Sequence, residues 1–223
     1  MLRTRLTLLC LLVLGSARAV AGGEIYDRFP DVIRPAERYV IYSHGLIVEG
    51  TDPRPVSPEL GVYDFPAVTQ ALAAGGGFNL IAHHRPKGTV PEAYAGMLDG
   101  WVRRLLGAGV APGRITLVGF SRGGQITAMA SSRLAATGIH TALLAVCPRG
   151  DLDAVPPIVL GGHVLSIYET TDAVRSCAGL AARSHLASFE EVAISTGKKH
   201  GAFFQPLPEW VRPLRAWIDR TNR

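Results

Sequence analysis

Short apolar segments rich in β-branched residues alternate with longer segments of helical periodicity along most of the chain. The short segments predict strands buried on both faces, as the strands of a parallel sheet are. They are Tyr39–Tyr42, Leu80–Ala82, Ile115–Val118, Leu143–Cys147, Val164–Tyr168 and Phe189–Ile194. Helices are predicted between and after them, several with a proline near the first turn. Their ranges are Phe65–Ala74, Pro91–Leu106, Gln125–Ala136, Val174–Ser184 and Leu207–Arg220. The alternation predicts an α/β domain with a doubly wound, mostly parallel sheet and a site at the carboxyl ends of its strands.

The longest irregular stretch, Leu46–Gly61, is rich in proline, glycine and acidic residues and follows the first clear strand. It predicts a loop of a length that often serves function. Only short stretches separate the later strands and helices, so little or no cap over the site is expected.

The N-terminal segment has the features of an export signal. Arg3 and Arg5 precede the apolar run Leu6–Leu14, and an Ala-x-Ala cleavage sequence follows. This pattern predicts a secretory signal peptide over residues 1–19 and a periplasmic or secreted product. The run is well short of the ~20 apolar residues that span a membrane. Residues 20–223 are enough for one domain and too few for two ordinary ones.

Charge argues against a nucleic-acid partner. The full chain carries a formal net charge of +5, but Arg3, Arg5 and Arg18 lie in the signal peptide, so the mature chain carries little net charge. It has no basic run longer than Lys198-Lys199, and it lacks the interleaved aromatic residues that stack on bases. We expect a small-molecule partner, no nucleic acid, and no stable membrane span once the signal is removed.

Two cysteines remain in the mature chain, Cys147 and Cys177. Because an exported protein meets an oxidising compartment, a disulfide between them is expected. Two separate buried thiols are the alternative. No metal site is expected, because the pair lacks a CxxC partner or a nearby histidine at ligand spacing.

The pentapeptide Gly119-Phe120-Ser121-Arg122-Gly123 lies between a predicted strand and a predicted helix. In that context Gly-x-Ser-x-Gly indicates a nucleophile elbow, in which a strained turn exposes the serine hydroxyl and the glycines let strand and helix approach closely. A plain strand-to-helix connection is the alternative.

A serine nucleophile needs a base and an acid to orient that base. His200 lies in a polar, glycine-containing loop after the last predicted strand, and Asp172 follows the preceding strand. The order Ser121, Asp172, His200, each after a predicted strand, is the one expected where a doubly wound sheet carries a nucleophile elbow. Asp172 also suits a helix N-cap. Alternative acids are Glu169, Asp151 and Asp153.

An oxyanion needs two backbone N–H donors. Arg122, the residue after the serine, is one candidate. Leu46 is the other, because it lies in the loop after the first clear strand, where Gly45 lets the backbone turn its amides inward. His44, Gly45 and Arg85 are the candidate substrate-binding residues, Arg85 as part of an anion-binding rim if it points to the pocket. His140 and His185 are expected at helix ends or on the surface.

The elbow, the His44-Gly45 pair and the Ser121, Asp172, His200 order resemble the α/β-hydrolase superfamily over most of the mature chain. The resemblance implies a Ser-His-Asp acyl-enzyme mechanism with no metal and no organic cofactor. The function expected is that of an exported serine hydrolase acting on carboxylic esters. The alternatives are a peptidase or cell-envelope acyltransferase using the same triad, and a non-catalytic binding protein on the same fold.

Overall fold

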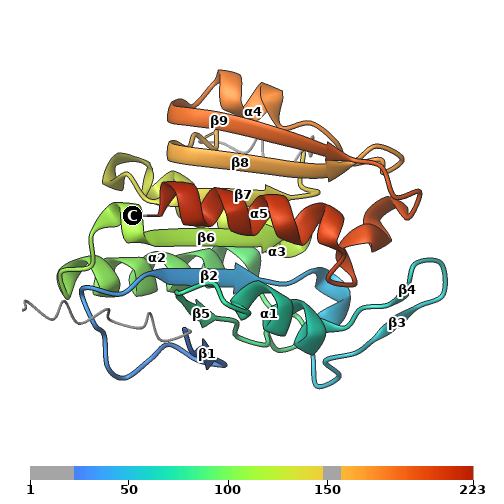
Figure 1. Ribbon diagram of the computed structural model, residues 1–223, viewed down its shortest axis with the longest axis horizontal. Helices are drawn as coiled ribbons and strands as arrows, with labels where there is room; N and C mark the ends of the chain where they lie inside the picture. Colours follow the sequence, from blue (N-terminus) through green and yellow to red (C-terminus); the bar gives the residue numbers. More distant parts are fainter. Residues whose placement is uncertain (1–22, 148–156, 223) are drawn as a thin grey trace, which may run out of the picture.

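The computed structural model describes residues 23–147 and 157–222, so the expected signal peptide, Asp151 and Asp153 lie outside the described residues. The described chain forms a seven-stranded sheet in the order β1-β5-β2-β6-β7-β8-β9 (Figure 1). Every pair of neighbouring strands in it is parallel. In chain order the strands are β1 (Ile25–Tyr26), β2 (Tyr39–Ser43), β5 (Asn79–Ile81), β6 (Ile115–Phe120), β7 (His140–Leu144), β8 (Gly161–Glu169) and β9 (His185–Ile194).

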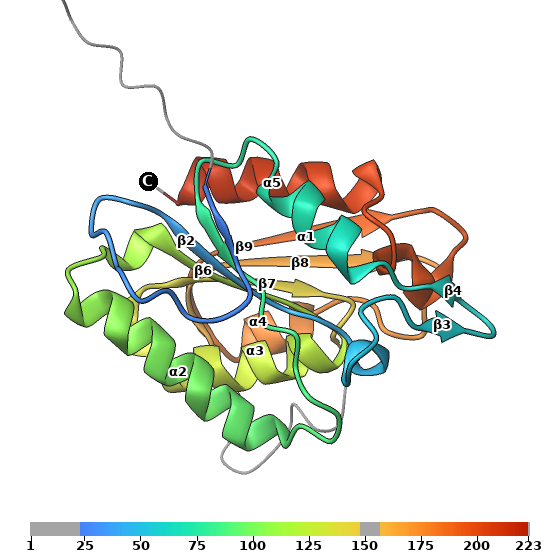
Figure 2. The same cartoon turned by 90° about the horizontal axis from the view of Figure 1, so that it is seen from below.

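Helices cover both faces of the sheet. Helices α1 (Phe65–Ala73) and α5 (Pro208–Thr221) lie on one face, and α2 (Pro91–Gly107), α3 (Arg122–Arg133) and α4 (Ala178–Ala182) lie on the other (Figure 2). The expected doubly wound α/β architecture is therefore confirmed.

Each helix layer buries an apolar face on the sheet. On the α1/α5 side, Trp210 and Trp217 of α5 pack into a core that includes Val118 of β6. On the α2/α3 side, Leu98 of α2 and Ile126 of α3 pack against the other sheet face. Burying such large apolar side chains is the main stabilising contribution to the fold.

Parallel pairing brings separate strand ends to one edge. Ser43 at the end of β2 pairs with Gly119 of β6, and Glu169 at the end of β8 pairs with Ile194 at the end of β9. The loops that follow these strands therefore start from the same edge of the sheet, and they carry the residues proposed from the sequence.

Some elements differ from the prediction. The strand expected over Leu143–Cys147 runs from His140 to Leu144, and it ends where Ala145 adopts a positive φ of 49°. His140 is buried at the start of this strand, so the expectation of a surface position was wrong. The helix expected from Val174 begins only at Ala178.

The long stretch after β2 is more ordered than expected. It contains the 3-10 helix η1 (Leu46–Val48) and an antiparallel hairpin of β3 (Val56–Ser57) and β4 (Gly61–Val62). The hairpin projects beyond the carboxyl edge of the sheet (Figure 1). Within residues 23–147 and 157–222 it is the main extension over that edge, consistent with the expected lack of a large cap.

Cys147 and Cys177 form a disulfide, with a Cα–Cα distance of 4.9 Å. The expected pairing is therefore present, and both residues are buried.

In the part of the chain that the structure describes, no helix combines the length and the apolar character needed to cross a bilayer.

Candidate active site

Ser121 occupies the single residue between β6 and α3, with φ 53° and ψ −117°. A positive φ is costly for a serine, and such strain persists only where the surroundings enforce it. Here the amide of Ser121 donates to the carbonyl of Leu144 at the end of β7, at 3.0 Å. The backbone of a nucleophile elbow is thus present at the predicted residue.

The glycines of the elbow are required by close backbone contacts. A Cβ on Gly119 would lie 2.4 Å from the carbonyl oxygen of Gly123, and one on Gly123 would lie 2.0 Å from the carbonyl oxygen of Ser43. No side chain fits at such distances. The second contact also presses the start of α3 against the end of β2, where the predicted oxyanion loop begins.

His200 and Asp172 form a hydrogen-bonded pair. Nδ1 of His200 lies 2.6 Å from Oδ2 of Asp172, and the two side chains are 23% and 6% exposed. His200 belongs to the 3-10 helix η5 (Lys199–Phe203), which follows β9. Its ring centroid is 4.8 Å from that of Phe120, the residue before Ser121. The structure therefore brings the predicted base beside both the predicted acid and the elbow.

Asp172 has no second role as a helix cap. The nearest helix, α4, begins at Ala178, and its N-cap is Cys177. The other oxygen of Asp172 accepts a hydrogen bond from the amide of Val174 at 3.3 Å, which holds the loop after β8 in a local turn. Its position is thus explained by the loop and by His200, and no longer by helix capping.

Glu169, the runner-up acid, points elsewhere. It is fully buried, and its carboxylate accepts hydrogen bonds from Thr171, Thr196 and Gly197. Burial alone would raise the pKa of Glu169, but the hydrogen bonds from these residues outweigh it and lower the pKa to about 2. Glu169 is therefore ionised, and both of its carboxylate oxygens accept hydrogen bonds from the loops that carry Asp172 and His200.

The predicted oxyanion donors lie on elements that touch. Arg122 is the first residue of α3, where backbone N–H groups have no intrahelical acceptor. Its side chain turns along the helix and donates to the side-chain oxygen of Gln125 at 3.3 Å. Leu46 begins η1 directly after Gly45, and a Cβ on Gly45 would lie 2.9 Å from the ring of Phe120. Gly45 therefore lets this loop pack on the elbow.

His44 and Arg85 are buried, and their polar groups contact each other. Nδ1 of His44 donates to the carbonyl of Gly45 at 2.8 Å, and its Nε2 accepts from the amide of Arg85 at 2.9 Å. The guanidinium of Arg85 donates to the carbonyl of His44 and pairs with the buried Glu49 at 3.3 Å. Burial, then the charge of Arg85, lowers the pKa of His44 well below its usual value.

These contacts give His44 and Arg85 a role in shaping the loop that carries Leu46. Neither side chain reaches solvent, so the open anion-binding rim considered for Arg85 is not what the structure contains. Substrate contact by His44, Gly45 and Arg85 stays a prediction. The partner of Arg85 was missed because Glu49 lies in the long irregular stretch, where sequence spacing gives no contact.

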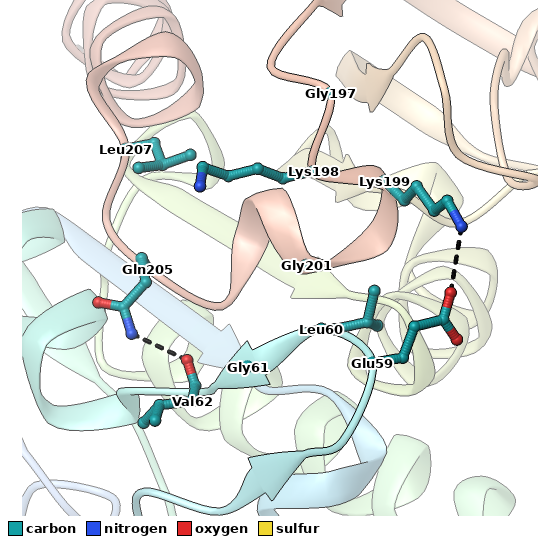
Figure 3. Close-up of a pocket in the computed structure, with 10 residues that line it drawn as sticks. All are labelled: Glu59, Leu60, Gly61, Val62, Gly197, Lys198, Lys199, Gly201, Gln205 and Leu207. Atoms are coloured by element: carbon teal, nitrogen blue, oxygen red, sulfur yellow. Dashed lines mark hydrogen bonds and ion pairs between the residues drawn. The ribbon is translucent and has the colours of Figure 1, made fainter.

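A hollow of about 460 Å³ lies between the β3–β4 hairpin and the segment around η5 (Figure 3). Gly201, next to His200, lines it together with Leu60 and Lys198. Two contacts join its walls, from Lys199 to Glu59 at 3.1 Å and from Gln205 to the carbonyl of Val62 at 2.8 Å (Figure 3). The hollow borders the candidate site.

Apolar side chains are exposed near the same edge. Leu46 and Ile47 of η1 are 50% and 40% exposed, and Val56 and Val62 of the hairpin are exposed as well.

Among residues 23–147 and 157–222, no cluster of histidine, cysteine, aspartate and glutamate side chains is arranged to hold a metal ion.

No family model matches the sequence, and no curated protein matches it. Solved structures do match its fold. An arylesterase has a TM-score of 0.59 at 14% identity, covering 86% of this chain and 78% of its own. A monoacylglycerol lipase from Paleococcus ferrophilus has a TM-score of 0.57 at 15% identity, covering 82% and 94%. SOBER1 from Arabidopsis thaliana has a TM-score of 0.53 at 13% identity, covering 84% and 100%. Together with the parallel sheet, the flanking helices and the elbow, these likenesses show that the chain has the α/β-hydrolase fold.

Proposed function

We propose that the mature chain is an exported serine hydrolase that cleaves carboxylic esters through an acyl-enzyme on Ser121. One observation carries the proposal: the hydrogen-bonded His200–Asp172 pair lies against the residue that precedes a strained serine. The names of the structural neighbours, an arylesterase and a monoacylglycerol lipase among them, favour an ester over other acyl bonds.

The hydrogen bond to Asp172 fixes the tautomer of His200. Since a carboxylate only accepts, Nδ1 of His200 carries the hydrogen, and Nε2 keeps a lone pair. In the proposed first step, Nε2 takes the proton of the Ser121 hydroxyl as its oxygen attacks the ester carbonyl. The imidazolium that forms is stabilised by its hydrogen bond to the side chain of Asp172.

The carbonyl oxygen becomes negative as the carbon becomes tetrahedral. The amides of Arg122 and Leu46 are the proposed donors to that oxyanion, the first helped by the positive end of the α3 dipole. Protonation of the leaving alcohol by His200 then leaves the acyl group on Ser121. A water deprotonated by His200 attacks the acyl-enzyme, releases the acid and restores the serine.

Export is proposed on two grounds. The first is the signal-like pattern of Arg3, Arg5 and the apolar run Leu6–Leu14. The second is the Cys147–Cys177 disulfide, which is the kind of bond that persists in an oxidising compartment.

A fluorophosphonate probe tests the nucleophile, because it labels only an activated serine. The purified mature protein should be labelled in proportion to its concentration, and Ser121→Ala should not be labelled at all. Ser43→Ala tests a second serine at this sheet edge and should be labelled like wild type. Absence of labelling in the wild-type protein, or labelling of Ser121→Ala, would rule out this proposal.

A second measurement distinguishes an ester hydrolase from a peptidase, an amidase or an acyltransferase. We expect hydrolysis of 4-nitrophenyl acyl esters, measured with acyl chains of graded length, and at least a hundredfold slower cleavage of a matching anilide. Equal rates on the anilide would indicate a peptidase or amidase. A product ester formed with an added alcohol in preference to the free acid would indicate an acyltransferase.

A further inference from the structure

The carboxylate of Glu169 divides its hydrogen bonds between two loops. Oε2 accepts from the amide and the hydroxyl of Thr171, at 2.6 and 2.5 Å. Oε1 accepts from the amides of Thr196 and Gly197, at 2.8 and 3.0 Å, and from the hydroxyl of Thr196 at 3.4 Å. Thr171 directly precedes Asp172, and Gly197 lies three residues before His200. One oxygen thus serves the acid loop and the other the base loop.

The position of Glu169 suits it to act on both loops. It is the last residue of β8 and pairs with Ile194, the last residue of β9, so both loops leave the sheet beside it. Its carbonyl accepts from the amide of Asp172 at 3.1 Å. Thr170 adds a parallel link, because its amide donates to the carbonyl of Ile194 at 2.9 Å.

The chemistry requires a carboxylate at this point. All five groups that face the two oxygens are N–H or O–H donors, and an ionised carboxyl is acceptor-only with room for about four such bonds. Among the described residues no lysine or arginine forms an ion pair with Glu169, so these hydrogen bonds are what compensates its burial. A glutamine has nearly the same shape, but its NH2 group would face N–H or O–H donors of one of the loops, and two donors cannot form a hydrogen bond with each other.

We propose that Glu169 is a positioning residue of the candidate active site. Its carboxylate fixes the separation of the loops that carry Asp172 and His200, so that their 2.6 Å hydrogen bond is already formed before substrate binds. The inference rests on the proposed function, since it concerns the alignment of the proposed acid and base. It differs from the role of alternative acid, because the carboxylate of Glu169 accepts its hydrogen bonds from the loops while Nδ1 of His200 is paired with Asp172.

The test is Glu169→Gln, measured on a 4-nitrophenyl ester. We expect kcat to fall about ten- to a hundredfold, because small misplacements of catalytic groups have effects of that order. KM should stay within about twofold, since the change does not touch the substrate. Glu190→Gln is the matched control, a glutamate on β9 that pairs with Arg220 at the surface, and it should leave both constants unchanged.

A double-variant cycle separates alignment from general damage. In a His200→Ala background there is no acid–base pair left to align, so adding Glu169→Gln should leave the residual rate within about twofold. If Glu169→Gln lowers the rate as much in that background as in wild type, the inference is wrong, because the lower rate then reflects a smaller amount of folded protein. Thr171→Val is a milder variant that removes one donor and keeps Glu169. It should lower kcat by a few-fold, and it serves if Glu169→Gln does not fold.

The two proposals fail in different ways. If kcat of Glu169→Gln and of Thr171→Val equals that of wild type while Ser121→Ala is inactive, Glu169 has no positioning role and the serine hydrolase stands. If Ser121→Ala retains activity, the proposed function itself is wrong.

Discussion

In the proposed mechanism, the hydrogen bond between His200 and Asp172 determines which imidazole nitrogen is free to act as the base. An asparagine at position 172 can offer its NH2 group to Nδ1, which favours the tautomer with the hydrogen on Nε2. We therefore predict that Asp172→Asn lowers kcat by up to about 10⁴-fold, with a small change in KM. Steady-state kinetics on a 4-nitrophenyl ester measures both constants.

Asp99→Asn is the matched control for that prediction. Asp99 pairs with Arg103 one turn along α2, on the surface, and its replacement should leave kcat unchanged. A kcat of Asp172→Asn close to the wild-type value would contradict the assignment and leave His200 without its acid.

At the residue scale, the sequence predicts positions better than contacts. Ser121, His200 and several candidate acids follow strand ends, and parallel strands bring such ends together, so this group could be proposed from order alone. Which carboxylate meets His200 depends on side-chain direction, which spacing does not specify. The same limit explains why Arg85 was considered for a pocket rim and is instead buried with Glu49.

The disulfide connects two elements that bear on the site. Cys147 follows β7, and Cys177 ends the segment that leads from Asp172 to α4. The amide of Arg175 donates to the carbonyl of Cys147, and the side chain of Arg175 donates to the carbonyl of Asp172 at 3.0 Å. The bond therefore ties the acid loop to the neighbouring strand end.

We predict that the Cys147→Ser/Cys177→Ser double variant is less stable than wild type by about 3 kcal/mol, as expected for closing a loop of this length. Urea unfolding monitored by tryptophan fluorescence measures the difference. Wild type unfolded in the presence of a reductant should approach the variant. Free thiols in the exported wild-type protein, found by alkylation and mass analysis, would contradict the pairing in the cell.

At the element scale, segments with a strong apolar pattern were predicted within a few residues. The strands β2, β6 and β9 and the helices α1, α2 and α5 are examples. The errors fall where a pattern competes with local geometry. The positive φ of Ala145 ends β7 early although Val146 and Cys147 are apolar, and the disulfide segment delays the start of α4. The β3–β4 hairpin is too short to produce an alternating pattern.

Buried ionisable groups link the stability of the whole molecule to pH. His140, at the start of β7, packs against the rings of His163 and Trp217. Burial, then the neighbouring His163, lowers the pKa of His140 from 6.5 to about 4. Glu169 behaves in the opposite sense to a simply buried acid, because its hydrogen bonds hold its pKa near 2 against a usual value of 4.5.

The signs of the two contributions follow from proton binding. Between pH 6.5 and 4 the unfolded chain takes up a proton at residue 140 that the folded chain refuses, so the free energy of unfolding falls as pH is lowered. Between pH 4.5 and 2 the unfolded chain protonates residue 169 while the folded chain keeps it ionised, so stability falls again. We therefore predict a decline in two successive windows, His140 acting in the upper one.

His140→Phe tests the upper window, because it keeps a ring in the core and removes the titrating group. Wild type should lose stability between pH 6.5 and 4 with a contribution from this residue of up to about 1.4 kcal/mol per pH unit. In this pH range the free energy of unfolding of the variant should depend less steeply on pH, whatever its absolute stability at pH 8. His44 should account for part of the pH dependence that remains. His185→Phe changes an exposed histidine at the start of β9 and should keep the wild-type slope. Denaturant unfolding at a series of pH values measures all three proteins, and equal slopes for wild type and His140→Phe would show that this core histidine does not couple folding to acid.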